Sequence, residues 1–152
     1  MPEYPPALGE IVDLFEHLSD DEKRENLIVF ADQAAACAPH PGEVFDLEDV
    51  RKDEECTDTV GVFMKVDRVT RAALVRITLG RQVQTLTRAM TAILCKGFEG
   101  ATPEAILDVP QDFVPKIVGG QLVRLRSQTV YYILTRIKSA AKVWLNRERA
   151  AG

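Results

Sequence analysis

Cys56 has the surroundings in this sequence that best fit thiol chemistry. It follows the acidic run Asp53–Glu55, precedes Asp58, and stands directly ahead of an alternating apolar segment. Because four carboxylates do not pack inside a strand, we expect the thiol in a loop or at the rim of a sheet. A reactive thiol fits that place. The competing interpretation is a buried small hydrophobe, which is the usual fate of a free cysteine.

The other possible ligands do not share a metal-binding spacing. The three cysteines are 19 and 39 residues apart, which matches neither a disulfide framework nor the paired cysteines of zinc modules. Cys37 and Cys95 fall on the flanks of apolar helical stripes, where a packing role is expected. His17 and His40 have no companion ligand at metal spacing, and His40 is expected in a loop. We therefore expect free thiols, no metal and no cofactor.

The charge is distributed unevenly along the chain. Before Thr59 there are 17 acidic and 4 basic side chains, and from Thr59 onward there are 6 acidic and 15 basic ones, for a net charge of −4. An acidic first half would repel a phosphate backbone, which argues against nucleic-acid binding. Two interpretations remain open: the charges are solvated faces that attract each other within the fold, or the acidic half steers a basic partner.

Length and composition favour one soluble domain over residues 1–152. A chain of 152 residues with 46% hydrophobic content can bury one sizeable core. No apolar run reaches the length of a membrane span, and the first residues lack the blocks of a signal peptide, so we expect a cytoplasmic protein. Residues 1–9 are expected to be flexible and 147–152 frayed. No motif of a hydrolase or a nucleotide-binding enzyme is present.

The elements expected around Cys56 are helices at both ends of the chain and a small sheet in the middle. Helical spacing predicts a short helix up to Leu18 and a second from the capping box of Ser19 and Glu22 to about Cys37. An edge strand is expected at 43–47, and alternation predicts strands at 59–66 and 70–79, paired as an antiparallel hairpin.

Helices are expected again after Gly80. The spacing predicts one long helix ending at Gly100, short helices starting at Thr102 and near Pro110, and a terminal helix whose apolar stripe covers 130–145. Its opposite side is expected to be a solvated basic face, made of Arg136, Lys138, Lys142, Arg147 and Arg149. The fold class is therefore α+β, with about three antiparallel strands packed against several helices.

The order of these elements and several sequence blocks resemble the SufE family of sulfur acceptors. The resemblance is clearest over 96–142, in GFEGATPEAILDVPQDFVPKIV and LVRLRSQTVYYILTRIKSAAK. DLFEHLSDDEKRENLIVFADQ resembles the family's opening helices, so the resemblance covers about 11–143. It implies a fold like those of SufE and IscU, and a role in iron–sulfur cluster assembly beside a SufS-like cysteine desulfurase and a downstream Fe–S scaffold. It leaves open a monomer or a homodimer.

Carried over by position, Cys56 is the sulfur-accepting thiol and Arg126 is the family's functional arginine. The chain departs from the family pattern around the thiol, with Glu55 before it and Thr57 and Asp58 after it, and with Gly61 in the following strand. Two alternatives to the sulfur acceptor stay open. One is a metal or cluster scaffold built from all three cysteines, and the other is an interaction module without thiol chemistry.

Overall fold

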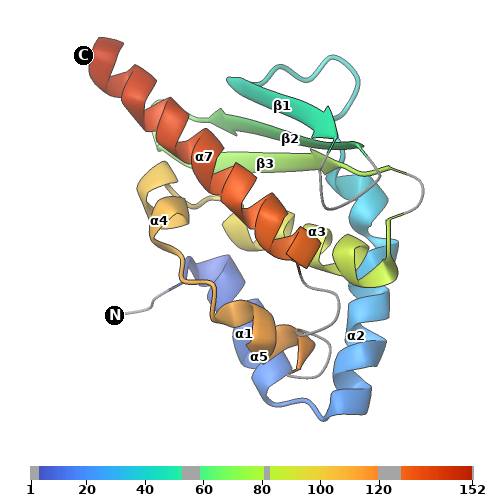
Figure 1. Cartoon of the computed structure of the whole chain (residues 1–152). Coiled ribbons are helices and arrows are strands. Elements are labelled where there is room, and N and C mark those ends of the chain that lie inside the picture. Colours follow the sequence, from blue (N-terminus) through green and yellow to red (C-terminus); the bar gives the residue numbers. More distant parts are fainter. Residues whose placement is uncertain (1–3, 53–58, 81–82, 120–127, 152) are drawn as a thin grey trace.

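The computed structural model describes residues 4–52, 59–80, 83–119 and 128–151. Up to residue 52 the chain forms helices α1 and α2, a short 3-10 turn η1 and strand β1, and from residue 59 it forms strands β2 and β3 and helices α3, α4, α5 and α7 (Figure 1). In chain order the elements are α1 (Pro6–Glu16), α2 (Asp20–Asp32), η1 (Ala34–Cys37), β1 (Leu47–Lys52), β2 (Thr59–Val66), β3 (Ala73–Thr78), α3 (Thr85–Phe98), α4 (Pro103–Asp108), α5 (Phe113–Val118) and α7 (Gln128–Ala151). The predicted α+β class is confirmed.

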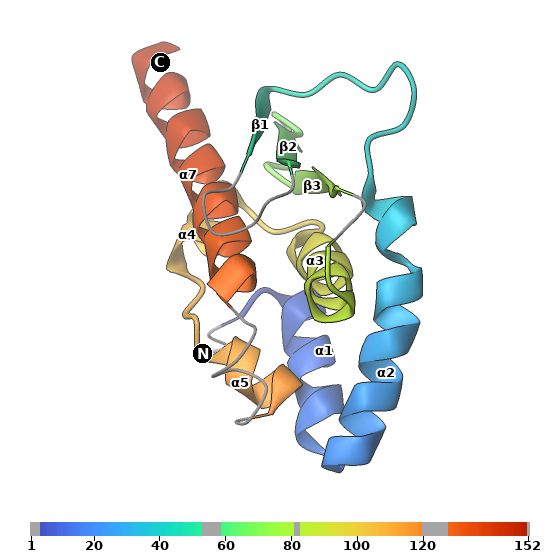
Figure 2. The ribbon, with the colours of Figure 1, turned by 45° about the vertical axis from the view of Figure 1, so that its right-hand side comes forward.

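The sheet has the order β1-β2-β3, and both pairs are antiparallel. The predicted alternation of β2 is confirmed, because Val60, Val62, Met64 and Val66 are buried on the side of the sheet that faces the helices. Helices α3 and α7 cover that side, as Figures 1 and 2 show from two directions. The predicted hairpin of β2 and β3 is also confirmed, although β3 is shorter than expected.

The prediction for the edge strand was wrong. We expected it at 43–47, whereas β1 spans Leu47–Lys52. Its alternation is inverted, because Asp49 is partly buried while Val50 is 56% exposed. An acidic residue on the inner side removes the apolar signal by which a strand is usually predicted from sequence.

The connection between η1 and β1 covers the outer face of the sheet (Figure 2). Phe45 packs on Phe63 of β2 with ring centroids 5.4 Å apart, and the ammonium of Lys65 lies 5.5 Å from the Phe45 ring. The carboxylate of Glu43 forms an ion pair with Lys65 at 2.8 Å and accepts a hydrogen bond from the backbone N–H of His40 at 3.0 Å. The outer face is therefore partly covered, over β2, while Val50 of β1 remains exposed on it.

Helix α3 lies at the centre of the helical half and packs against α1 and α2. It approaches α1 closely, because a Cβ atom at Gly97 would lie 2.9 Å from a methyl of Leu8. The predicted capping box of α2 is present: the Ser19 hydroxyl accepts from the Glu22 N–H at 3.3 Å, and the Glu22 carboxylate accepts from the Ser19 N–H at 3.0 Å. However, α2 ends at Asp32, and η1 continues to Cys37.

The later helices differ from expectation mainly at their ends. Thr102 caps α4 as predicted, since its hydroxyl accepts from the Ala105 N–H at 3.2 Å. Helix α5 begins at Phe113 rather than near Pro110, and α7 begins at Gln128 and continues to Ala151, beyond its apolar stripe. Among the described helices, none is long and apolar enough to span a membrane.

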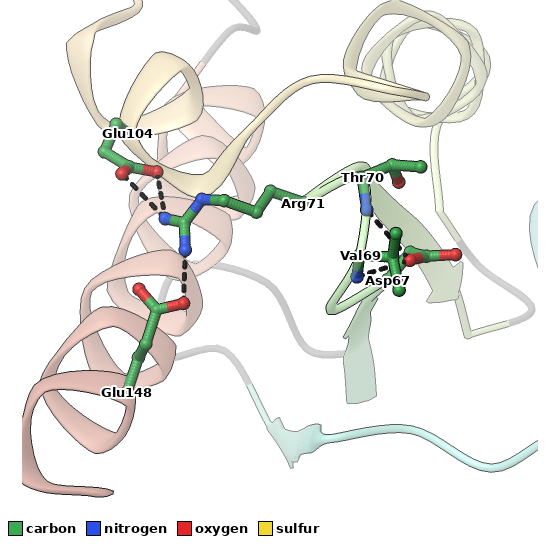
Figure 3. Close-up of polar contacts among 6 residues, drawn as sticks. All are labelled: Asp67, Val69, Thr70, Arg71, Glu104 and Glu148. Atoms are coloured by element: carbon green, nitrogen blue, oxygen red, sulfur yellow. Dashed lines mark hydrogen bonds and ion pairs between the residues drawn. The ribbon is translucent and has the colours of Figure 1, made fainter. Parts of the chain in front are cut away.

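The turn between β2 and β3 is held by its own side chains (Figure 3). The Asp67 carboxylate accepts hydrogen bonds from the N–H groups of Val69 and Thr70 at 2.8 and 3.1 Å. Arg71 then takes a φ of 64°, and its N–H donates to the Asp67 carbonyl at 2.6 Å. That conformation usually favours glycine, so the backbone of Arg71 is in a conformation that is unfavourable for a residue with a Cβ atom.

Arg71 joins this turn to two helices. Its guanidinium binds both carboxylate oxygens of Glu104 in α4 at 2.7 Å and forms an ion pair with Glu148 in α7 (Figure 3). The same group lies 5.3 Å from the Trp144 ring. The C-terminal part of α7 is thus fixed against the turn end of the sheet.

The conformation of Arg71 predicts an unusual order of stability between two variants. Arg71→Gly and Arg71→Ala lose the same ion pairs, but only alanine keeps a Cβ at a positive φ. We therefore expect the glycine variant to be about 1 kcal/mol more stable than the alanine variant. Urea unfolding of both variants measures the difference, and equal midpoints with equal slopes would contradict it.

Glu43 predicts a pH dependence. The hydrogen bond from Lys65 and that from the His40 N–H lower the pKa of the Glu43 carboxyl to about 2. The ionised form therefore stabilises the fold above the ordinary carboxyl range, and this contribution is lost as the pH falls toward 2. We expect Glu43→Gln to be less stable than wild type at neutral pH, with the difference shrinking in acid. Urea unfolding across pH, with exposed Glu48→Gln as the control, tests this.

Candidate functional site

The two residues expected to carry the chemistry, Cys56 and Arg126, lie outside the described residues. The structure does describe β1 and β2, the strands that precede and follow Cys56 in the sequence. Lys52 at the end of β1 and Thr59 at the start of β2 are paired across the ladder. Partners in an antiparallel ladder have Cα atoms about 4.5–5.5 Å apart, so the six-residue connection that contains Cys56 leaves and returns at almost the same point.

Arg136 of α7 binds both of these strands. Its Nε donates to the Asp49 carboxylate at 3.1 Å, and its Nη2 donates to the carbonyls of Asp49 at 2.6 Å and Val60 at 2.8 Å. We call this set of contacts the Arg136 bridge. Val60 is the second residue of β2 and pairs with Arg51 of β1, so the bridge lies beside the strand ends that lead to Cys56.

The Arg136 bridge overturns one prediction from the sequence. Arg136 was expected on a solvated basic face, yet its side chain is 3% exposed. Arginine remains protonated even when buried, so its charge must be met by acceptors. Here one carboxylate and two carbonyls meet it, while Nη1 has no hydrogen-bond partner among the described residues.

Two further members of the expected basic face are also engaged. Lys138 donates to the Val109 carbonyl, and Arg147 donates to the Asp46 carbonyl at 3.2 Å. Arg147 is nevertheless exposed, as are Lys142 and Arg149, as expected. Much of this side of α7 therefore binds backbone carbonyls, so basic side chains alone do not mark its solvent face.

The fold brings Cys37 and Cys95 together. Both are buried, which confirms the packing role expected for them, and their side chains share a hydrogen bond. That bond, with help from Lys96 and Arg76, lowers the pKa of the Cys37 thiol to about 7. The same bond and burial raise the pKa of Cys95. The two thiols therefore lie together where η1 packs on α3.

This pair does not by itself form a metal site. A structural zinc site needs four ligands, and within the described ranges no group of three or more His, Cys, Asp or Glu residues could hold a metal ion. His17 instead has its ring Nδ1 2.7 Å from the Asp13 carbonyl. The third cysteine of the scaffold alternative, Cys56, lies outside the described residues.

Sequence reasoning missed Arg136 because its partners are distant in the chain. Asp49 precedes it by 87 residues and Val60 by 76. No local signal set Arg136 apart: at about 100° per residue, Arg136 and Lys142 lie equally far from the centre of the apolar stripe, on opposite sides of it.

Comparison with known proteins agrees with this architecture. The solution structure of a hypothetical protein from Thermus thermophilus is similar, with a TM-score of 0.72 and 23% identity over 94% of this chain and 98% of that chain. This likeness shows the fold. No curated protein matches the chain. The family model of the Fe-S metabolism associated domain, SufE, matches residues 9–141. Since that match covers most of the sequence, the chain belongs to the SufE family of Fe–S metabolism associated domains.

Proposed function

We propose that this protein accepts persulfide sulfur from a cysteine desulfurase on Cys56 and passes it on for iron–sulfur cluster assembly. The observation that carries the proposal is membership of a family associated with Fe–S metabolism. The position of Cys56 supports it, because the thiol stands in a six-residue connection between the paired ends of β1 and β2.

The transfer needs a thiolate and a donor persulfide. The Cys56 thiolate attacks the outer sulfur of the desulfurase persulfide, a new S–S bond forms on Cys56, and the desulfurase leaves as a thiolate. The donor persulfide comes from the desulfurase, whose pyridoxal phosphate supplies the earlier chemistry. Arg126 matches the family arginine by sequence, and we assign it to stabilising the anionic sulfur.

The acidic neighbours of Cys56 make this thiol a poor nucleophile in the free protein. Like charges disfavour ionisation, so Asp53, Glu54, Glu55 and Asp58 raise the energy of a thiolate beside them. A basic partner surface, or Arg126, would offset that charge. Under this proposal the Cys56 thiol stays protonated in the free protein and ionises when the desulfurase is bound.

Sulfur loading is tested by intact mass under non-reducing conditions. After incubation with a desulfurase and cysteine, we expect one added sulfur atom on the wild-type protein and none on Cys56→Ser. The control is Cys37→Ser with Cys95→Ser, which removes the buried thiols and should load normally. Loading of Cys56→Ser would contradict the proposal, and so would an unmodified wild type.

The ionisation of Cys56 is tested by iodoacetamide alkylation across pH, read on the peptide that contains it. We expect a thiol pKa at or above the reference of about 8.5 in the free protein, because of the surrounding carboxylates. Neutralising Glu55 and Asp58 together should lower it. A pKa below the reference in the free wild-type protein would show that the acidic residues do not hold the thiol protonated.

A further inference from the structure

We propose that Arg136 is a positioning residue for sulfur transfer at Cys56. The proposal rests on the function proposed above and adds a residue to which the family resemblance gives no role. Arg136 binds Asp49 of β1 and Val60 of β2 through one planar guanidinium. It thereby holds the two strands between which the Cys56 connection runs.

The contacts of Arg136 fix both strands relative to a single group. Asp49 lies seven residues before Cys56, and Val60 lies four residues after it. Nη2 binds the main-chain carbonyl of each, and Nε binds the Asp49 carboxylate. Because the guanidinium is rigid and planar, these three bonds restrict the spacing and orientation of the strands more tightly than a lysine ammonium could.

Helix α7 is itself held firmly, so the bridge ties the strands to a fixed element. Arg71 binds Glu148 near the C-terminal end of α7, and Lys138 binds the Val109 carbonyl. The sequence places Arg126 two residues before Gln128, where α7 begins. One helix therefore carries the bridge to the Cys56 strands and follows directly on the arginine assigned to the sulfur.

Burial separates this role from catalysis. With 3% of its side chain exposed, Arg136 is held inside the fold by its three hydrogen bonds and has almost no surface with which to touch a partner protein. It acts through the strands that it binds. Small errors in the placement of reacting groups are costly, since a shift of about 1 Å can lower a rate by about 100-fold.

The test measures transfer from a desulfurase at increasing concentrations of the acceptor. We expect Arg136→Gln and Arg136→Lys to lower kcat for persulfide formation on Cys56 by about tenfold or more, with KM for the acceptor within about twofold of wild type. Lys142→Gln, an exposed change on the same helix, should leave both values unchanged. Alkylation of Cys56 across pH should keep its midpoint.

A second variant, Asp49→Ala, keeps the test informative if the Arg136 variants fail to fold. Asp49→Ala removes the carboxylate but leaves both carbonyl bonds, so we expect a smaller fall in kcat than for Arg136→Gln, with circular dichroism showing each variant folded. Wild-type kcat in folded Arg136→Gln, Arg136→Lys or Asp49→Ala would overturn the positioning role, as would an equal fall in Lys142→Gln. An absence of sulfur on wild-type Cys56 would instead refute the proposed function itself.

Discussion

The fold depends on one buried cation at the junction of its two halves. The guanidinium of Arg136 joins the terminal helix to β1 and β2, and it meets a carboxylate that points inward from an edge strand. The guanidinium would be costly to bury there without its acceptors, because a buried charge without a partner costs several kcal/mol, whereas the Asp49 side chain remains 37% exposed. The pairing explains why a strand with an acidic inner residue belongs to the sheet and why a basic residue of α7 is in the core.

Elements with local signals could be predicted from the sequence. The capping box of Ser19 and Glu22 marks the start of α2, the alternation from Val60 to Val66 marks β2, and the apolar stripe from Val130 to Leu145 marks α7. Each signal arises from residues a few positions apart, so no knowledge of the tertiary structure is needed to see it. Together with the sequence blocks of the family, these elements were sufficient for the fold class.

Features that depend on distant partners could not be predicted in the same way. β1 lacks apolar alternation because Asp49 is matched by Arg136, and the contact of Cys37 with Cys95 joins η1 to α3. From the sequence alone, Asp49 and Arg136 fit a solvated surface, and Cys37 and Cys95 fit simple packing in the core. The assignment of Cys56 and Arg126 is of another kind: it comes from resemblance over short blocks, and it stays a prediction.

The chain positions joined by Arg136 also bear on how the molecule is made. During synthesis from the N-terminus, Asp49 and Val60 leave the ribosome long before Arg136, which follows them by 87 and 76 residues. Until Arg136 emerges, the Arg136 bridge between β1 and β2 cannot form. This contact therefore forms only after α7 has been made, which places it late in the assembly of the fold.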